Sequence, residues 1–101
     1  MGAEAAYADL ARTLGVQPAE GGGFGGGTLT ADGKIFAMLV GGRLVVKLPA
    51  ARCAELVADG TGEVFTMGNG RRMREWIAIE PAHHAHWTEL AREARTFADL
   101  G

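Results

Sequence analysis

Three neighbouring histidines are the residues of this sequence best suited to metal chemistry. His83, His84 and His86 follow Pro81, at the expected start of the last helix. His83, His86 and Glu89 are spaced by three, so on a helix they lie along adjacent sides and could share a metal ion. A helical zinc site usually has histidines four residues apart with a glutamate between them, and a fourth ligand is not evident here. We interpret the segment as an exposed polar turn and predict no metal and no cofactor.

Cys53 is the only cysteine, which excludes an intramolecular disulfide. A nucleophilic cysteine needs a positioned base and a lowered pKa. Cys53 instead falls on the apolar stripe of a helix expected at residues 50–58, which favours a buried, unreactive thiol. The chain contains no serine, and no pair of carboxylates is brought together by spacing. The sequence therefore predicts no catalytic residues and a protein that is not an enzyme.

Arg71, Arg72 and Arg74 form the one basic cluster, between a Gly-Asn-Gly turn and Trp76. Arginines beside an aromatic ring can hold a phosphate or a nucleic-acid backbone. The net charge of −2, however, provides no global attraction for nucleic acid. We interpret the cluster as a solvated hairpin tip and keep an anion or nucleic-acid contact as the alternative. The carboxylates of a partner protein would fit equally well.

Residues 21–27 read GGGFGGG, which invites a phosphate-loop interpretation. The segment lacks the Gly-Lys-Ser/Thr ending and a preceding strand, and the following Thr-Leu-Thr favours a strand over a helix. We expect a flexible entry into the first strand, with Phe24 as an apolar anchor.

The elements that position these residues are organised around a β-hairpin at residues 34–48. Two apolar runs flank Gly41-Gly42, and paired glycines supply the positive φ angles of a two-residue turn. Alternation then predicts a wholly apolar core face, with the pairs Leu39/Leu44, Ala37/Val46 and Ile35/Leu48. The second face is apolar in the middle and basic at its edges, and we interpret it as the interaction surface: Phe36, Met38, Val45, Arg43 and Lys47.

A short strand at residues 28–30 is expected to pair with the hairpin through Ala31-Asp32-Gly33. If Asp32-Gly33 is a two-residue turn, Leu29 lies opposite Phe36 on the second face. If Ala31 joins the loop and a bulge follows, Leu29 lies opposite Ile35 on the core face. We favour the bulge.

The remaining pattern predicts helices at residues 4–14, 50–58 and 81–99 and strands at 63–66 and 72–79. The second helix should bury Cys53, Leu56 and Val57. In the last strand, Met73, Ile77 and Ile79 share one side, and Trp76 and Ala78 share the other. The order helix, three strands, helix, two strands, helix predicts an α+β fold with a mainly antiparallel, five-stranded sheet covered by helices on one face.

Length and composition predict one soluble domain, residues 1–101, because 48% of the residues are hydrophobic and 22% are charged. The first ten residues carry two acidic residues and no basic one, unlike a signal peptide, so we expect a cytoplasmic location. The longest apolar run, at residues 35–40, is far shorter than the roughly 20 residues needed to span a membrane.

Several segments, taken in order, resemble the N-terminal domain of the TfoX/Sxy family. They read DGKIFA at 32–37, GRLVVKLP at 42–49, ELV at 55–57, GTGEVF at 60–65 and GRRMREW at 70–76, and the resemblance extends over about residues 25–97. The YjbR/MmcQ family is similar in the strands at 33–37 and 44–49 and is the close alternative. At residues 23–25, Gly-Phe-Gly stands where the TfoX family usually has Met-Phe-Gly.

The resemblance implies a secretion-chaperone-like α+β fold, a non-enzymatic role and no catalytic residues. The two-domain members of the family are regulators of competence that act with the transcription machinery, whereas for these 101 residues we expect a single domain without their second, helical domain. We therefore expect an interaction domain that forms a homodimer, with a possible protein partner in transcription. A nucleic-acid-associated regulator using the three arginines is the second hypothesis, and a small-ligand or metal binder is the third.

Overall fold

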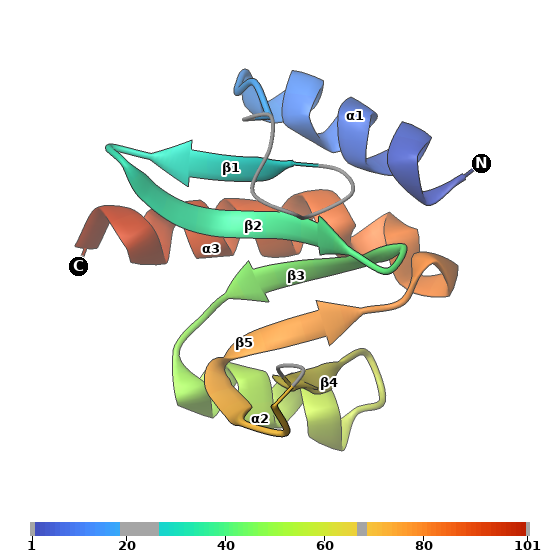
Figure 1. The fold of residues 1–101 in the computed structure, drawn as a ribbon, viewed down its shortest axis with the longest axis vertical. Helices are drawn as coiled ribbons and strands as arrows, with labels where there is room; N and C mark the ends of the chain where they lie inside the picture. The colour runs from blue at the N-terminus through green and yellow to red at the C-terminus, as the bar shows by residue number, and fades with distance from the viewer. Residues whose placement is uncertain (1, 19–26, 67–68, 101) are drawn as a thin grey trace.

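The computed structural model describes residues 2–18, 27–66 and 69–100 (Figure 1). These residues form α-helices, a 3₁₀-helix and strands in the predicted order, which confirms the α+β class. The elements are α1 (Ala3–Leu14), β1 (Thr28–Ala31), β2 (Lys34–Val40), β3 (Arg43–Lys47), α2 (Ala50–Ala58), β4 (Glu63–Thr66), β5 (Arg72–Ile79), η1 (Pro81–His86) and α3 (Trp87–Leu100). Within the described ranges, no helix has the length and apolar character needed to cross a membrane.

The strands form one antiparallel sheet in the order β1-β2-β3-β5-β4. The predicted β2–β3 hairpin is confirmed, since Leu39 pairs with Leu44 and Ala37 with Val46. Its two turn residues, Gly41 and Gly42, have φ angles of 58° and 79°. Residues with a side chain rarely adopt such positive φ angles, which explains why the turn is built from a pair of glycines.

The main core lies between the helices and one face of the sheet. In Figure 1, α2 and α3 lie behind the sheet, and α1 lies beside the edge strand β1. Tyr7 fixes α1 to the start of β1, because its hydroxyl donates a hydrogen bond to the carbonyl oxygen of Gly27 at 3.2 Å. The core is built mainly from one side of the sheet and the apolar stripes of the helices, including Leu44, Val46 and Trp87.

The β1–β2 connection differs from the favoured prediction. Asp32 and Gly33 form a two-residue turn with positive φ angles, since Ala31 pairs with Lys34. The bulge lies further inside the hairpin, where Leu29 pairs with Ala37 rather than with Ile35. Leu29 is fully buried in the main core, so its predicted face is correct although its predicted partner is wrong.

Two details of the helices also differ from prediction. Val57 is 42% exposed rather than part of the buried stripe of α2. The last helix begins as the 3₁₀-helix η1, with a kink at His83, and becomes an α-helix only at Trp87. The predicted roles of residues 21–26 and of Phe24 lie outside the described residues.

Candidate protein-interaction surface

The face of the sheet away from α2 and α3 carries a small apolar group that we call the open-face cluster. Its buried members lie on the central strands, and half-buried side chains surround them. The cluster consists of Met38, Val45 and Ala78, with Val40, Phe65 and Trp76 around them. No residue of the described helices belongs to it, in keeping with the position of α2 and α3 behind the sheet (Figure 1). Its solvent-facing part is therefore made by Val40, Phe65 and Trp76.

The predicted placement of Phe36 on this surface is wrong. Phe36 is 0% exposed in the main core, whereas Ile35, which alternation assigns to the core, is 40% exposed. Thr30 pairs with Ile35 and Leu29 with Ala37, so Phe36 is the extra residue of a β-bulge. A bulge shifts the alternation of faces, and Phe36 therefore joins Ala37 on the helix-covered side.

Met38 and Val45 do lie on the open face, but both are buried, at 7% and 0% exposed. The two basic residues predicted with them are half-buried at the edge of the cluster. Arg43 forms a long ion pair of 3.9 Å with Glu63 of β4, and the Lys47 ammonium lies 6.0 Å from the centre of the Trp76 ring. An apolar patch with a charged rim is the usual anatomy of a protein interface.

The structure brings together two of the three clustered arginines. Arg72 and Arg74 line a pocket of about 360 Å³ whose other walls are Val64 and the N-terminal half of α2, with Ala50, Cys53 and Ala54. The first turn of α2 has no side-chain cap hydrogen bond and no acidic residue, so its N–H groups and the helix dipole make the pocket electropositive. Arg71 is not part of the lining, and its backbone N–H donates to Asn69 Oδ1 at 2.9 Å in the preceding turn.

The histidines are exposed on η1, and the rings of His83 and His86 are 6.5 Å apart and tilted by 38°. His84 Nδ1 lies 3.1 Å from the carbonyl oxygen of Pro81, within its own turn. Across residues 2–18, 27–66 and 69–100, no three His, Cys, Asp or Glu side chains are arranged to hold a metal ion. The predicted arrangement of His83, His86 and Glu89 assumed one continuous α-helix. In the structure the two histidines lie in the 3₁₀-helix η1 and Glu89 lies in α3, so that assumption does not hold.

Cys53 is buried, as predicted, and its Sγ lies 3.6 Å from the carbonyl oxygen of Leu48. Burial is the largest cause that raises the pKa of the thiol, and the nearby Glu75 carboxylate raises it further. Although Cys53 also lines the pocket of Arg72 and Arg74, a buried thiol with a raised pKa is a poor nucleophile.

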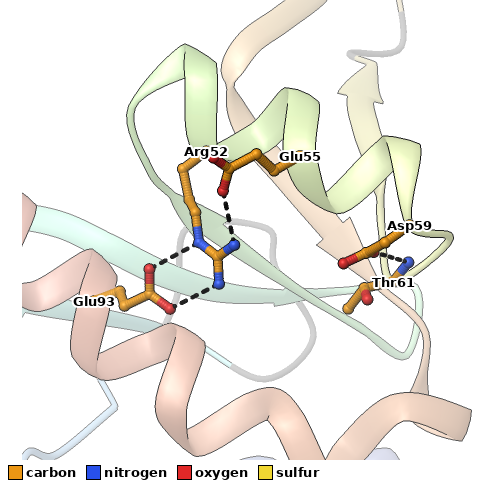
Figure 2. A network of polar contacts seen from close by, with 5 residues as sticks. All are labelled: Arg52, Glu55, Asp59, Thr61 and Glu93. Atoms are coloured by element: carbon orange, nitrogen blue, oxygen red, sulfur yellow. Dashed lines mark hydrogen bonds and ion pairs between the residues drawn. The ribbon is translucent and has the colours of Figure 1, made fainter.

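The best-formed polar network joins α2 to α3 (Figure 2). Arg52 donates from Nε and Nη2 to the two carboxylate oxygens of Glu93, at 3.0 and 3.2 Å, and from Nη1 to Glu55 at 3.0 Å. Glu93 and then Glu55 raise the pKa of the guanidinium. At the end of α2, hydrogen bonding from Thr61, by its side chain and its backbone N–H, lowers the pKa of Asp59. We interpret these groups as structural, because each carboxylate of the network already has a hydrogen-bond partner within the fold.

The predicted surface did not include Phe65 or Trp76, and it did not name Val40, although alternation along β2 places Val40 on the same face as Met38. Alternation along β5 does separate Trp76 from Ile77, and that signal was available. What brings Trp76 beside Lys47 is the pairing of β3 with β5, which are not consecutive strands. In addition, Val64 pairs with Ile77 but Phe65 with Met73, and local pattern does not reveal such a shift.

The described residues thus define an α+β domain whose antiparallel sheet is backed by helices on one face and carries an apolar cluster on the other. Compared with known families, residues 22–98 match the model of the TfoX N-terminal domain, and the chain belongs to that family. This confirms the resemblance drawn from the sequence. Comparisons with the curated proteins and with the solved structures find no match.

Proposed function

We propose that this chain is a non-enzymatic protein-interaction domain that self-associates through the open face of its sheet. The observation that carries the proposal is the open-face cluster, where Val40, Phe65 and Trp76 are half-buried around Met38 and Val45. A contiguous apolar patch of this kind with a charged rim is typical of an interaction site.

A second copy of the chain is the occupant that the charges favour. Arg43 and Glu63 lie at one side of the cluster and Lys47 at another, so the rim carries both signs. In a two-fold dimer the same patch meets itself, and a rim of mixed charge can pair with its own copy. A stable interface of about 800 Å² per partner would take roughly one seventh of the 5792 Å² surface of one copy.

The non-enzymatic part of the proposal is supported by the state of the candidate nucleophile and bases. Cys53 is buried with a raised pKa, and the histidines are exposed on η1 away from it in sequence. A role as an accessory in transcription or competence comes from the family resemblance, and it would be exercised through protein contacts.

Light scattering on the purified protein tests self-association. The variant Val40→Glu puts a charge on the half-buried edge of the cluster, and Val57→Glu makes the same change at an exposed position of α2. We expect a dimer for the wild type and for Val57→Glu, and a folded monomer for Val40→Glu. Met38→Glu is less suitable, since a charge at a buried position would unfold the monomer.

A wild-type protein that stays monomeric up to high concentration would overturn the proposal. So would a Val40→Glu variant that dimerises as strongly as Val57→Glu. Circular dichroism of each variant separates loss of the dimer from loss of the fold.

The pocket of Arg72 and Arg74 favours a second candidate function, that of a nucleic-acid-associated regulator. Two guanidinium groups beside an uncapped helix N-terminus have the charge and the N–H donors that attract a phosphate. Fluorescence anisotropy with DNA at low and moderate salt tests it. Direct binding should weaken steeply with salt and be lost in Arg72→Ala/Arg74→Ala, while Arg12→Ala/Arg92→Ala, with the same change in net charge, should bind normally. Equal binding by both double variants would count against this candidate.

A further inference from the structure

A second pocket, at the end of the sheet where β2 begins and β3 ends, combines an apolar wall with positive charge. It has a volume of about 390 Å³, within the range of about 300–1,000 Å³ found for small-molecule sites. It is lined by Gly33, Lys34, Ile35, Lys47, Trp76, Phe97 and Ala98. The C-terminal part of α3 lies at the same end of the molecule, at the left of Figure 1.

The charge of this pocket is one-sided. The sequence contains only two lysines, and both line the pocket, with no carboxylate among the lining residues. Lys34 Nζ lies 3.5 Å from the carbonyl oxygen of Ala98, a long contact, and Lys47 Nζ lies over the Trp76 ring at 6.0 Å. On a chain with a net charge of −2, this is a local positive site. Two ammonium groups without carboxylate partners in the lining favour a bound anion.

The apolar wall is the other half of the site. The β-bulge turns Ile35 away from the core. Its side chain is 40% exposed and lines this pocket. Trp76 and Phe97, both half-buried, supply aromatic surface beside it. Bulges often re-aim a side chain next to a binding site. An apolar ligand body would cover these three side chains, and its anionic group would meet the lysines.

We propose that this pocket binds a small organic anion, namely a carboxylate carried on an aromatic or branched apolar body. The lysines hold the carboxylate, and Ile35, Trp76 and Phe97 contact the body. The site goes beyond self-association, because Lys34, Ile35 and Phe97 are not part of the open-face cluster.

The test is a titration of the ¹⁵N-labelled protein followed by NMR with three probes: 3-phenylpropionate, 3-phenylpropionamide and propionate. The two indole N–H signals make the readout specific. Trp76 lines the pocket, whereas the Nε1–H of the buried Trp87 is bonded to the carbonyl oxygen of Glu80 at 3.3 Å. We expect saturable shifts of the Trp76 signal with 3-phenylpropionate and little change at Trp87. The amide and propionate should each bind about tenfold more weakly, since each lacks one half of the recognition.

Variants complete the test. Lys34→Met and Lys47→Met keep an apolar stem and remove the charge, and each should weaken 3-phenylpropionate about tenfold. Arg12→Met, on α1, makes the same charge change outside the pocket and should bind like the wild type. Equal affinity for the acid and its amide, or no loss in either lysine variant, would overturn the proposal.

A last arm compares a short peptide ending in phenylalanine with a free carboxylate against 3-phenylpropionate. Tighter binding of the small acid, or equal binding, supports a small-molecule site. Saturable binding of the peptide alone would overturn the assignment to a small molecule.

Discussion

The burial of Phe36 and the exposure of Ile35, the reverse of the arrangement predicted from the sequence, can be tested directly by mutation. Strict alternation along β2 puts Ile35 in the core and Phe36 on the surface, and the β-bulge reverses both. Truncating each side chain to alanine therefore distinguishes the two arrangements. The comparison is internal, because the two positions are adjacent on one strand.

The magnitudes follow from burial. Phe36 is 0% exposed within the main core, and removing such a ring costs about 3–5 kcal/mol of unfolding free energy. Ile35 is 40% exposed, so Ile35→Ala should cost about 1 kcal/mol, a fraction of the value for full burial. Since about 1 kcal/mol shifts the midpoint by roughly 4–8 °C in a domain of this size, the two variants should differ by more than about 8 °C in Tm.

Urea denaturation followed by circular dichroism provides the free energies, with thermal melts alongside. A domain of this size has about 5–15 kcal/mol of stability, so Phe36→Ala could prevent folding altogether. Phe36→Leu, which keeps most of the apolar volume, then serves in its place and should cost more than Ile35→Leu, the matched exchange at the exposed position. If Ile35→Ala proved the more damaging of the two alanine variants, the bulge and the surface assignment that depends on it would be refuted.

Three further predictions concern the supports of the fold. A double-mutant cycle with Arg52→Met and Glu93→Gln should yield a coupling of at most about 1 kcal/mol, because the side chains are 36% and 42% exposed; a coupling several times larger would contradict this. Burial raises the pKa of Tyr7 above its ordinary value of 10.0, so the folded state favours the neutral phenol, and the free energy of unfolding falls as the pH rises above 10.0. Tyr7→Phe should lose about 1 kcal/mol at neutral pH, because the hydrogen bond to Gly27 is lost. In thermal melts, the Tm of this variant should fall less steeply at alkaline pH than the Tm of the wild type. Gly62→Ala would place a Cβ 2.7 Å from Ile77 Cγ1, and urea denaturation should show a loss of about 1–3 kcal/mol, whereas an unchanged midpoint would contradict that packing.

Local chemistry made much of the fold predictable from the sequence. Gly41-Gly42 set the β2–β3 turn, and the register followed because the side-chain period of a strand is two residues. Gly15 follows the helix predicted at residues 4–14 and ends α1 in a left-handed conformation with φ of 72°, which glycine adopts readily. The buried residues of α3 recur every three or four positions, because a helix buries one continuous side: Trp87, Leu90, Ala91, Ala94 and Ala98.

The rest depended on packing between segments distant in sequence. Either Ile35 or Phe36 is apolar enough for the core, and the β-bulge buries the larger Phe36 ring there, which alternation alone does not reveal. Val57 also fits an amphipathic pattern, yet the elements packed against α2 leave it exposed. For the candidate surfaces, Met38 and Val45 were identified, but Phe65 and Trp76 were not, because their position beside the β2–β3 hairpin depends on the order of strands in the sheet.

Trp76 connects the two proposed sites. Its ring packs against the open-face cluster and also lines the pocket of the two lysines. A ligand in that pocket and a second copy on the open face would therefore contact the same side chain from different sides. Equilibrium coupling is reciprocal, so any factor by which 3-phenylpropionate changes dimer affinity must equal the factor by which dimerisation changes its own binding. Val40→Glu, which is expected to be monomeric with an intact pocket, provides the affinity of the uncoupled state. An affinity identical to that of the dimeric wild type would mean that Trp76 keeps one position in both states and that the two sites act independently.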